Sequence, residues 1–119
     1  MRAHLDQVVV DSRNPRALVR FWAGLLGGDV VDRGFEWSHV EPPGFVRLAF
    51  QPVPEDKAVK NRLHLDLEVE DVDAAVAEAV RLGALPVGEV VVDDRGGFQV
   101  MADPEGNEFC FIFREHASG

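Results

Sequence analysis

The chain has 119 residues, 46% of them hydrophobic, and a formal net charge of −9, which fits one globular domain able to bury a normal core. A phosphate backbone would repel so acidic a chain, so we expect no nucleic-acid partner. No apolar run is long enough to cross a membrane, no apolar signal segment opens the chain, and one cysteine allows no internal disulfide, so we expect a cytoplasmic protein that binds no membrane.

The first predicted elements are a strand at residues 5–11 and a helix that follows it. Asn14 is a good N-cap, and Pro15 suits the first helical position, where its missing N–H is no loss. Gly27 and Gly28 are expected to end this helix. Its apolar residues repeat with the spacing of one helix face: Leu18, Phe21, Trp22, Leu25 and Leu26.

Strands are predicted to complete the first half of the chain. Residues 29–41 are expected to form a strand pair, or one irregular strand, around Asp32-Arg33-Gly34. Residues 45–51 alternate as a strand does. The two faces of that strand are Val46, Leu48 and Phe50, and Arg47, Ala49 and Gln51. A polar stretch with two prolines, residues 52–61, then connects the two halves.

The second half begins with a predicted strand at residues 62–71. Its apolar face consists of Leu63, Leu65, Leu67 and Val69, and its polar face of His64, Asp66 and Glu68. Asp71 or Asp73 is expected to cap a helix within residues 72–84, which Gly83 ends. The apolar stripe of this helix is Val72, Val76, Ala79 and Val80.

Three strands are predicted after this helix. Residues 85–93 and 98–103 form the first two, and residues 95–97, Arg-Gly-Gly, form the hairpin loop between them. Residues 103–106, Asp-Pro-Glu-Gly, have the chemistry of a type I turn. The last strand, which reaches Phe113, has one face of Phe109, Phe111 and Phe113, and one of Glu108, Cys110 and Ile112.

Each half of the chain therefore shows the same order: a strand, a helix that ends in Leu-Gly, and further strands. Such a repeat predicts two similar modules, at about residues 4–55 and 62–114, within one domain over residues 1–119. The apolar strand faces are expected to pack on the helices. Functional side chains are therefore expected on the opposite faces, where Glu108 and Cys110 lie.

The sequence resembles the vicinal oxygen chelate superfamily, which includes glyoxalase I, bleomycin-resistance proteins, fosfomycin-resistance enzymes and extradiol dioxygenases, and more narrowly its glyoxalase-like domain group. The resemblance covers nearly the whole chain. It is carried by LDQVVVDSRNPRALVRFWAGLLG, NRLHLDLEVEDVDAAVAEAVRLGA and MADPEGNEFCF. It implies an α+β fold of two βαβββ modules, a cavity on the curved sheet, a small-molecule ligand and a homodimer.

The resemblance also implies positions for metal ligands on the cavity faces of four strands. The first-strand position falls on Gln7, and the position that opens the second module falls on His64. The last-strand Glu falls on Cys110, with Glu108 one pleat away as the candidate base. The remaining Glu falls where the cavity-side residues are Ala49 and Gln51. These departures remove the carboxylates that hold a divalent metal, so we expect no glyoxalase I activity and no certain cofactor.

The residues themselves leave alternatives open. His64 is a candidate metal ligand, or a histidine that hydrogen-bonds to Asp66, Gln7 or a backbone group. Cys110 is a packing residue or a thiolate, and a thiolate would need a cationic neighbour. Asp66 and Glu108 form either an acid–base pair or part of a solvated rim.

The expected ligand-binding residues are Trp37, Arg47, Gln51, Asp66 and Cys110. An aromatic side chain such as Trp37 on a cavity wall suits a flat organic ligand, and would equally suit a dimer contact. Three hypotheses follow. The protein binds a small molecule without metal; it is a lyase, dioxygenase or resistance enzyme with a divalent metal at His64 and Gln7; or it is a thiol enzyme or redox sensor built on Cys110.

Overall fold

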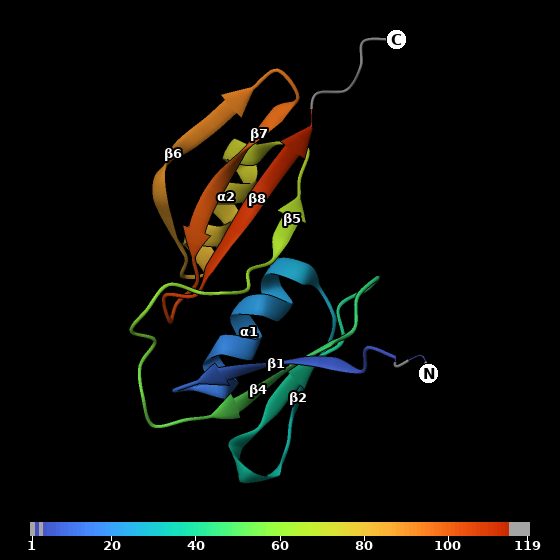
Figure 1. Cartoon of the computed structure of the whole chain (residues 1–119). Helices are drawn as coiled ribbons and strands as arrows, with labels where there is room; N and C mark the ends of the chain where they lie inside the picture. Colours follow the sequence, from blue (N-terminus) through green and yellow to red (C-terminus); the bar gives the residue numbers. More distant parts are fainter. Residues whose placement is uncertain (1, 3, 115–119) are drawn as a thin grey trace. The chain divides into compact units, whose positions relative to one another are not determined.

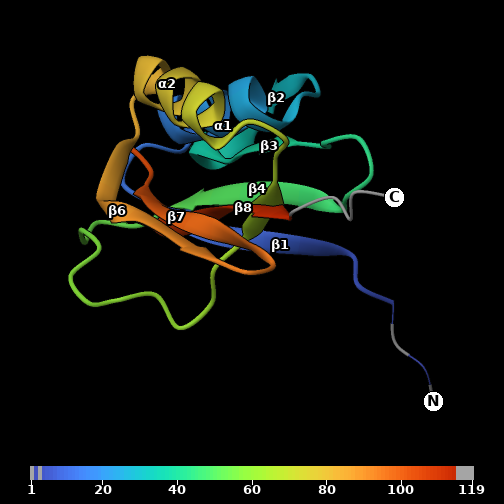
Figure 2. The ribbon, with the colours of Figure 1, turned by 90° about the horizontal axis from the view of Figure 1, so that it is seen from above.

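The computed structural model describes residue 2 and residues 4–114 (Figures 1 and 2). These residues form two compact units, with the boundary between Asp56 and Lys57. Each unit holds a four-stranded mixed sheet with one helix packed against it. Both units have the order strand, helix and three strands, so the predicted α+β fold of two βαβββ modules is confirmed.

The first unit is built around a parallel pair of strands, β1 and β4. Its elements are β1 (Gln7–Ser12), α1 (Pro15–Leu26), β2 (Val30–Asp32), η1 (Gly34–Glu36), β3 (Ser38–Val40) and β4 (Arg47–Pro52), in the sheet order β1-β4-β3-β2. The predicted cap of α1 is confirmed, because Asn14 Oδ1 accepts a hydrogen bond from the Ala17 N–H at 3.2 Å. Gly27 is the C-cap, with a φ of 88°.

The core of the first unit lies between α1 and one face of the sheet. Leu18, Phe21 and Trp22 of α1 are buried, as are Val40 of β3 and Leu48 and Phe50 of β4, which belong to the face that α1 covers. The alternation of β4 therefore leaves Arg47, Ala49 and Gln51 on the opposite, open face.

The second unit repeats this plan with longer strands. Its elements are β5 (Asp66–Glu68), α2 (Val72–Leu82), β6 (Leu85–Asp93), β7 (Gly96–Ala102) and β8 (Glu108–Arg114), in the sheet order β5-β8-β7-β6. Asp71 is the N-cap of α2, and Gly83 in the left-handed conformation ends it. The predicted turn at residues 103–106 is closed by a hydrogen bond of 2.9 Å from the Gly106 N–H to the Asp103 carbonyl.

The aromatic face of β8 makes the core of the second unit. Phe109 and Phe111 are buried under α2 with Met101, and their rings meet edge to face with centroids 5.5 Å apart. Figure 1 shows α2 behind β7 and β8, on one side of the sheet only. Since neighbouring residues alternate, Glu108, Cys110 and Ile112 lie on the other side, as the sequence predicts.

The predicted strand at residues 62–71 is wrong in its length, because β5 spans only three residues. The Asn61 side chain donates from Nδ2 to the Glu108 carbonyl at 2.9 Å and accepts from the Glu108 N–H at 3.3 Å. These bonds occupy the backbone groups that a longer β5 would pair with. Leu63 is consequently 81% exposed rather than part of an apolar face, and His64 precedes the strand.

Smaller differences occur elsewhere. Gly96 and Gly97 belong to β7, so the hairpin loop is Asp94 and Arg95 rather than residues 95–97. The first strand begins at Gln7 rather than at residue 5, and Pro52 belongs to β4 rather than to the connection. Val80 is 44% exposed, so it lies beside the buried stripe of α2 and not in it. None of the described helices is long and apolar enough to cross a membrane.

Candidate functional site

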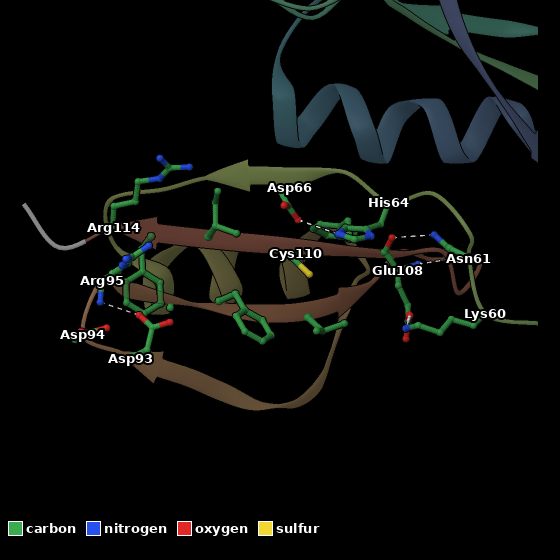
Figure 3. A pocket seen from close by; sticks show the side chains of 16 residues that line it. Lys60, Asn61, His64, Asp66, Asp93, Asp94, Arg95, Glu108, Cys110 and Arg114 are labelled. Carbon is green, nitrogen blue, oxygen red and sulfur yellow. Dashed lines mark hydrogen bonds and ion pairs between the residues drawn. The ribbon is translucent and has the colours of Figure 1, made fainter.

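The open face of the second sheet is hollowed into a concavity of about 1060 Å³ (Figure 3). Its floor is apolar, with Phe98 and Val100 from β7 and Ile112 from β8. The pairing of Phe98 with Ile112 and of Val100 with Cys110 puts these side chains in one continuous surface. The concavity therefore has the apolar base and polar margin that small-molecule sites usually have.

Three residues predicted as site residues meet at one end of this concavity. Asp66 and Cys110 are direct partners in the parallel pair β5–β8, and His64 lies two residues before Asp66. His64 Nε2 lies 3.2 Å from Asp66 Oδ1, and candidate ligand atoms of all three residues lie within 4.8 Å of one another. Figure 3 shows the three side chains gathered over the middle of β8.

Glu108, the predicted base, lies beside this cluster but is already bound. Lys60 Nζ donates to Glu108 Oε1. The hydrogen bond from Lys60 lowers the pKa of Glu108, burial opposes this shift, and the positive charges of Lys60, Lys57 and His64 add to it. Glu108 is therefore a carboxylate at neutral pH, and a carboxylate of low pKa is a weak general base.

Cys110 is half-buried in the lining of the concavity, beside Asp66. Burial raises the pKa of its thiol, the negative charges of Asp66 and Glu108 raise it further, and Lys60 acts in the opposite direction. A nucleophilic thiolate needs the reverse environment. These surroundings count against the hypothesis of a thiol enzyme or redox sensor.

The opposite end of the concavity holds charged residues that the sequence analysis missed. Asp93 Oδ1 accepts a hydrogen bond of 2.8 Å from the Arg95 N–H (Figure 3), and Arg114 Nε lies 3.4 Å from Glu68 Oε2. Arg114 alternates with Cys110 and Ile112, so period two would have placed it on this face. Arg95 lies in the β6–β7 hairpin, and only the pairing of these strands brings it to the concavity.

The other predicted site residues belong to the first unit. Gln7, Arg47 and Gln51 share the open face of its sheet, where Gln7 and Arg47 are direct partners on β1 and β4. Gln51 Nε2 donates to Asp11 Oδ1 at 2.6 Å, and Arg47 Nη2 lies 3.0 Å from Glu41 Oε1. Two of the three polar side chains thus have partners within their own unit.

Trp37 lies at the end of the η1 turn and is half-buried. Its backbone N–H donates to the Gly34 carbonyl at 3.3 Å, and its carbonyl accepts from the Arg33 N–H at 2.7 Å. The turn that carries Trp37 also carries Phe35, which is 94% exposed. The predicted roles of Trp37 in ligand binding or in a dimer remain predictions.

The resemblance implies a metal ion, and the side chains that lie together in the concavity show which kind of ion they suit. His64, Asp66 and Cys110 supply nitrogen, oxygen and sulfur atoms. Mg²⁺ and Ca²⁺ take six or more ligands, nearly all oxygens, so this set does not suit them. Zn²⁺ and similar ions accept imidazole, carboxylate and thiolate together in four-coordinate sites. The residues therefore fit a borderline transition-metal ion with one open position.

The profile of the glyoxalase-like domain family matches residues 7–112. No curated protein matches the chain significantly. A glyoxalase/bleomycin resistance protein/dioxygenase family enzyme from Burkholderia phytofirmans PsJN is similar in structure, with a TM-score of 0.78 at 20% identity over 95% of this chain and 100% of that chain.

Two further solved structures have the same architecture. The fosfomycin resistance protein FosX from Listeria monocytogenes gives a TM-score of 0.77 at 10% identity and covers 97% of this chain and 96% of its own. Oxidase ChaP-H2 gives 0.72 at 23% identity and covers 100% of this chain and 99% of its own. At such identities the likeness shows the fold alone. Because the family profile spans residues 7–112, the chain belongs to the glyoxalase-like domain family.

Proposed function

We propose that this protein binds a small organic molecule on the open face of its second sheet. The observation that carries the proposal is the concavity of about 1060 Å³ with an apolar floor and a charged margin. Phe98 is 39% exposed on that floor, and with Val100 and Ile112 it forms one continuous apolar surface. A flat molecule lying over Phe98, Val100 and Ile112 would remove this surface from water.

The charges at the margin favour some molecules over others. The lining cations are Lys60, Arg95 and Arg114, and the lining carboxylates are Asp66, Asp93, Asp94 and Glu108. Negative charges thus exceed positive ones, and the chain as a whole has a net charge of −9. We therefore propose a neutral or cationic aromatic compound as the ligand, since an anion would be repelled.

A panel of neutral, cationic and anionic aromatic compounds, screened by thermal shift, tests this proposal. A ligand at a hundredfold excess over its Kd stabilises the folded state by about 2.7 kcal/mol and so raises Tm measurably. Phe98→Ala should abolish the shift. Val80→Ala is the matched control, since Val80 has a similar exposure of 44% and lies on α2. The proposal fails if no compound shifts Tm, or if both variants respond like the wild type.

The second candidate function is a metal-dependent lyase, dioxygenase or resistance enzyme. The grouping of His64, Asp66 and Cys110 within 4.8 Å favours it. A bound divalent ion would act as a Lewis acid on the oxygens of a substrate. The apolar floor would orient the substrate, and Lys60 would hold Glu108 in its charged form.

Metal content of protein purified without chelator, measured by elemental mass spectrometry, distinguishes the two candidates. Near-stoichiometric metal that is lost in His64→Ala would support the metal-dependent function. Protein that contains no metal, and takes up none when divalent ions are added, would exclude the metal-dependent function and support binding of an organic molecule without metal.

Glyoxalase I activity is not part of the proposal. Cys110, and either Ala49 or Gln51, occupy the two positions where the resemblance implies carboxylates, and Glu108 is paired with Lys60. We expect no conversion of the methylglyoxal–glutathione adduct with Ni²⁺, Zn²⁺ or Mg²⁺. Any turnover by the purified protein would contradict the expectation that it lacks glyoxalase I activity. If Glu108→Gln retained that turnover, a residue other than Glu108 would move the proton.

We also propose that the protein is a homodimer. The resemblance to the vicinal oxygen chelate superfamily supports this proposal, and Phe35, which is 94% exposed in the first unit, is an apolar side chain that a partner would cover.

A further inference from the structure

We propose that the ligand of this concavity is an aromatic amine whose ammonium group binds to Asp66 while its ring lies over Phe98 and Ile112. The inference rests on the proposed function and deepens it, because it narrows the neutral or cationic compounds to one class and names the residue that selects it. All the residues involved belong to the second unit.

Strand pairing arranges the floor of the concavity in rows that cross the sheet. Register partners lie side by side on one face, so Asp66, Cys110 and Val100 form one row. Ile112 and Phe98 form the next row, two residues away along β8 and β7. Since a strand rises about 3.3 Å per residue, the two rows lie roughly 7 Å apart. A carboxylate therefore lies one row away from the most bulky apolar side chains of the floor.

The charges around the concavity favour Asp66 as the partner of a cation. Lys60 Nζ donates to Glu108 Oε1, so these two charges compensate each other. At the other end Arg95 and Arg114 line the concavity, and two guanidinium groups disfavour a bound cation there. In the described part of the chain, no lysine or arginine pairs with Asp66. Its negative charge is therefore available to a ligand.

The immediate neighbours of Asp66 leave it able to accept a ligand. Its side chain is 50% exposed, so an ammonium group can reach it from the concavity. His64 Nε2 lies 3.2 Å from Asp66 Oδ1, and a neutral imidazole does not cancel the charge. Burial and the negative charge of Asp66 raise the pKa of the Cys110 thiol, so this neighbour adds no charge of its own at neutral pH. A carboxylate accepts up to about four hydrogen bonds, so acceptor capacity remains.

The distance between the two rows defines the shape of the ligand. A hydrogen bond between an ammonium group and a carboxylate takes up about 2.8 Å of the roughly 7 Å. The rest is spanned by a chain of roughly two carbon atoms between the ring and the nitrogen. The expected class is therefore an arylethylamine, with its ring on Phe98 and its charge on Asp66.

Isothermal titration calorimetry with naphthylethylamine and naphthylethanol, in chelator to exclude metal ions, tests the inference. The two compounds share a ring and a spacer and differ in the charge of one group. We expect the amine to bind the wild type at least about tenfold more tightly than the alcohol, and Asp66→Asn to remove this preference while the Kd of the alcohol stays the same. Asp73→Asn makes the same change of charge in the first turn of α2, and should keep the preference.

Two outcomes would overturn the inference but leave the proposed function intact. One is equal binding of amine and alcohol by the wild type, and the other is a preference for the amine that persists in Asp66→Asn. Equal weakening of both compounds in Asp66→Asn would also overturn it, because the residue would then shape the floor and not select the charge. Circular dichroism confirms that each variant is folded. If neither compound binds the wild type, and no member of the aromatic panel shifts Tm, the inference and the proposed function both fail.

Discussion

Cys110 shows how neighbours set the chemistry of a single side chain. Its strand position was predictable, because period two separates it from Phe109 and Phe111. The raised pKa of its thiol was not predictable, since Asp66 is brought beside it only by the parallel pairing of β5 and β8. The same pairing joins Asp66 to the candidate metal site.

We expect Cys110 to react slowly with a thiol reagent at neutral pH in the folded protein. Burial and the charges of Asp66 and Glu108 raise the pKa of the thiol, so little thiolate is present. Labelling should be faster in denaturant, and Asp66→Asn should speed labelling of the folded protein. Stopped-flow absorbance measures both rates. Faster labelling of the folded wild type than of the denatured chain would contradict this prediction.

His39 is expected to make stability depend on pH. Burial lowers the pKa of His39 from its ordinary value of 6.5, and the positive charges of Arg47 and Arg33 lower it further, while Glu41 opposes them. The unfolded chain therefore binds this proton more readily than the folded one. The contribution of neutral His39 to the unfolding free energy is fully present above about pH 6.5. It is lost as pH falls below that value toward the lower pKa of His39 in the folded state.

Urea unfolding between pH 7.5 and 5, roughly spanning the histidine range, measures this effect. His39→Gln should show a smaller loss of unfolding free energy across the range than the wild type. His4→Gln, a change at an exposed histidine, should retain the wild-type dependence. An equal slope for all three proteins would show that His39 does not carry the effect.

At the scale of elements, the sequence predicted the ends of the helices better than the ends of the strands. Asn14, Asp71 and the glycines at both C-caps act within a few residues of the chain, so their effect can be read from the sequence. The length of β5 depends on Asn61 and Glu108, which are 47 residues apart in the chain. No local pattern contains that information.

The N-cap of α2 gives a test at this scale. Asp71 accepts a hydrogen bond from the Ala74 N–H at 3.1 Å, so Asp71→Ala should lower the unfolding free energy by about 1 kcal/mol. Asp71→Ser keeps a capping oxygen, so it should lower the unfolding free energy by only about a few tenths of a kcal/mol. Chemical denaturation measures both variants, and equal losses would show that the cap contributes nothing.

Gly96 at the β6–β7 hairpin gives a second test. Its φ is 138°, and a Cβ there would lie 2.0 Å from the Phe113 carbonyl oxygen. Gly96→Ala should therefore destabilise the protein by about 2–4 kcal/mol. Gly34→Ala is the control, because a Cβ at Gly34 would meet nothing within 4 Å. A thermal melt in which both variants match the wild type would contradict the structure of this hairpin.

At the scale of the whole molecule, the sequence predicted the repeat and the faces but not the complete site. Glu108, Cys110 and Ile112 of the last strand lie on the open face, as the sequence predicts. Phe98, Val100, Arg95 and Arg114 were missed, because the order β5-β8-β7-β6 brings them together from separate strands. The metal set expected from the resemblance also gave no role to Asp66.

The proposed homodimer is tested by sedimentation equilibrium. We expect a mass of about twice the 13.1 kDa of one chain. Replacement of the most exposed apolar residue in Phe35→Ser should shift the equilibrium toward monomer if the η1 turn lies in the interface. A wild-type mass of 13.1 kDa at all concentrations would contradict the homodimer.

The central claim is that ligands bind on the open face of the second sheet. Backbone amide chemical shifts, measured by NMR during titration with the strongest binder of the aromatic panel, test this claim most directly. The account predicts that the changes cluster at residues 60–66, on β7 and on β8. Changes confined to β1–β4 and their loops in the first unit would contradict it.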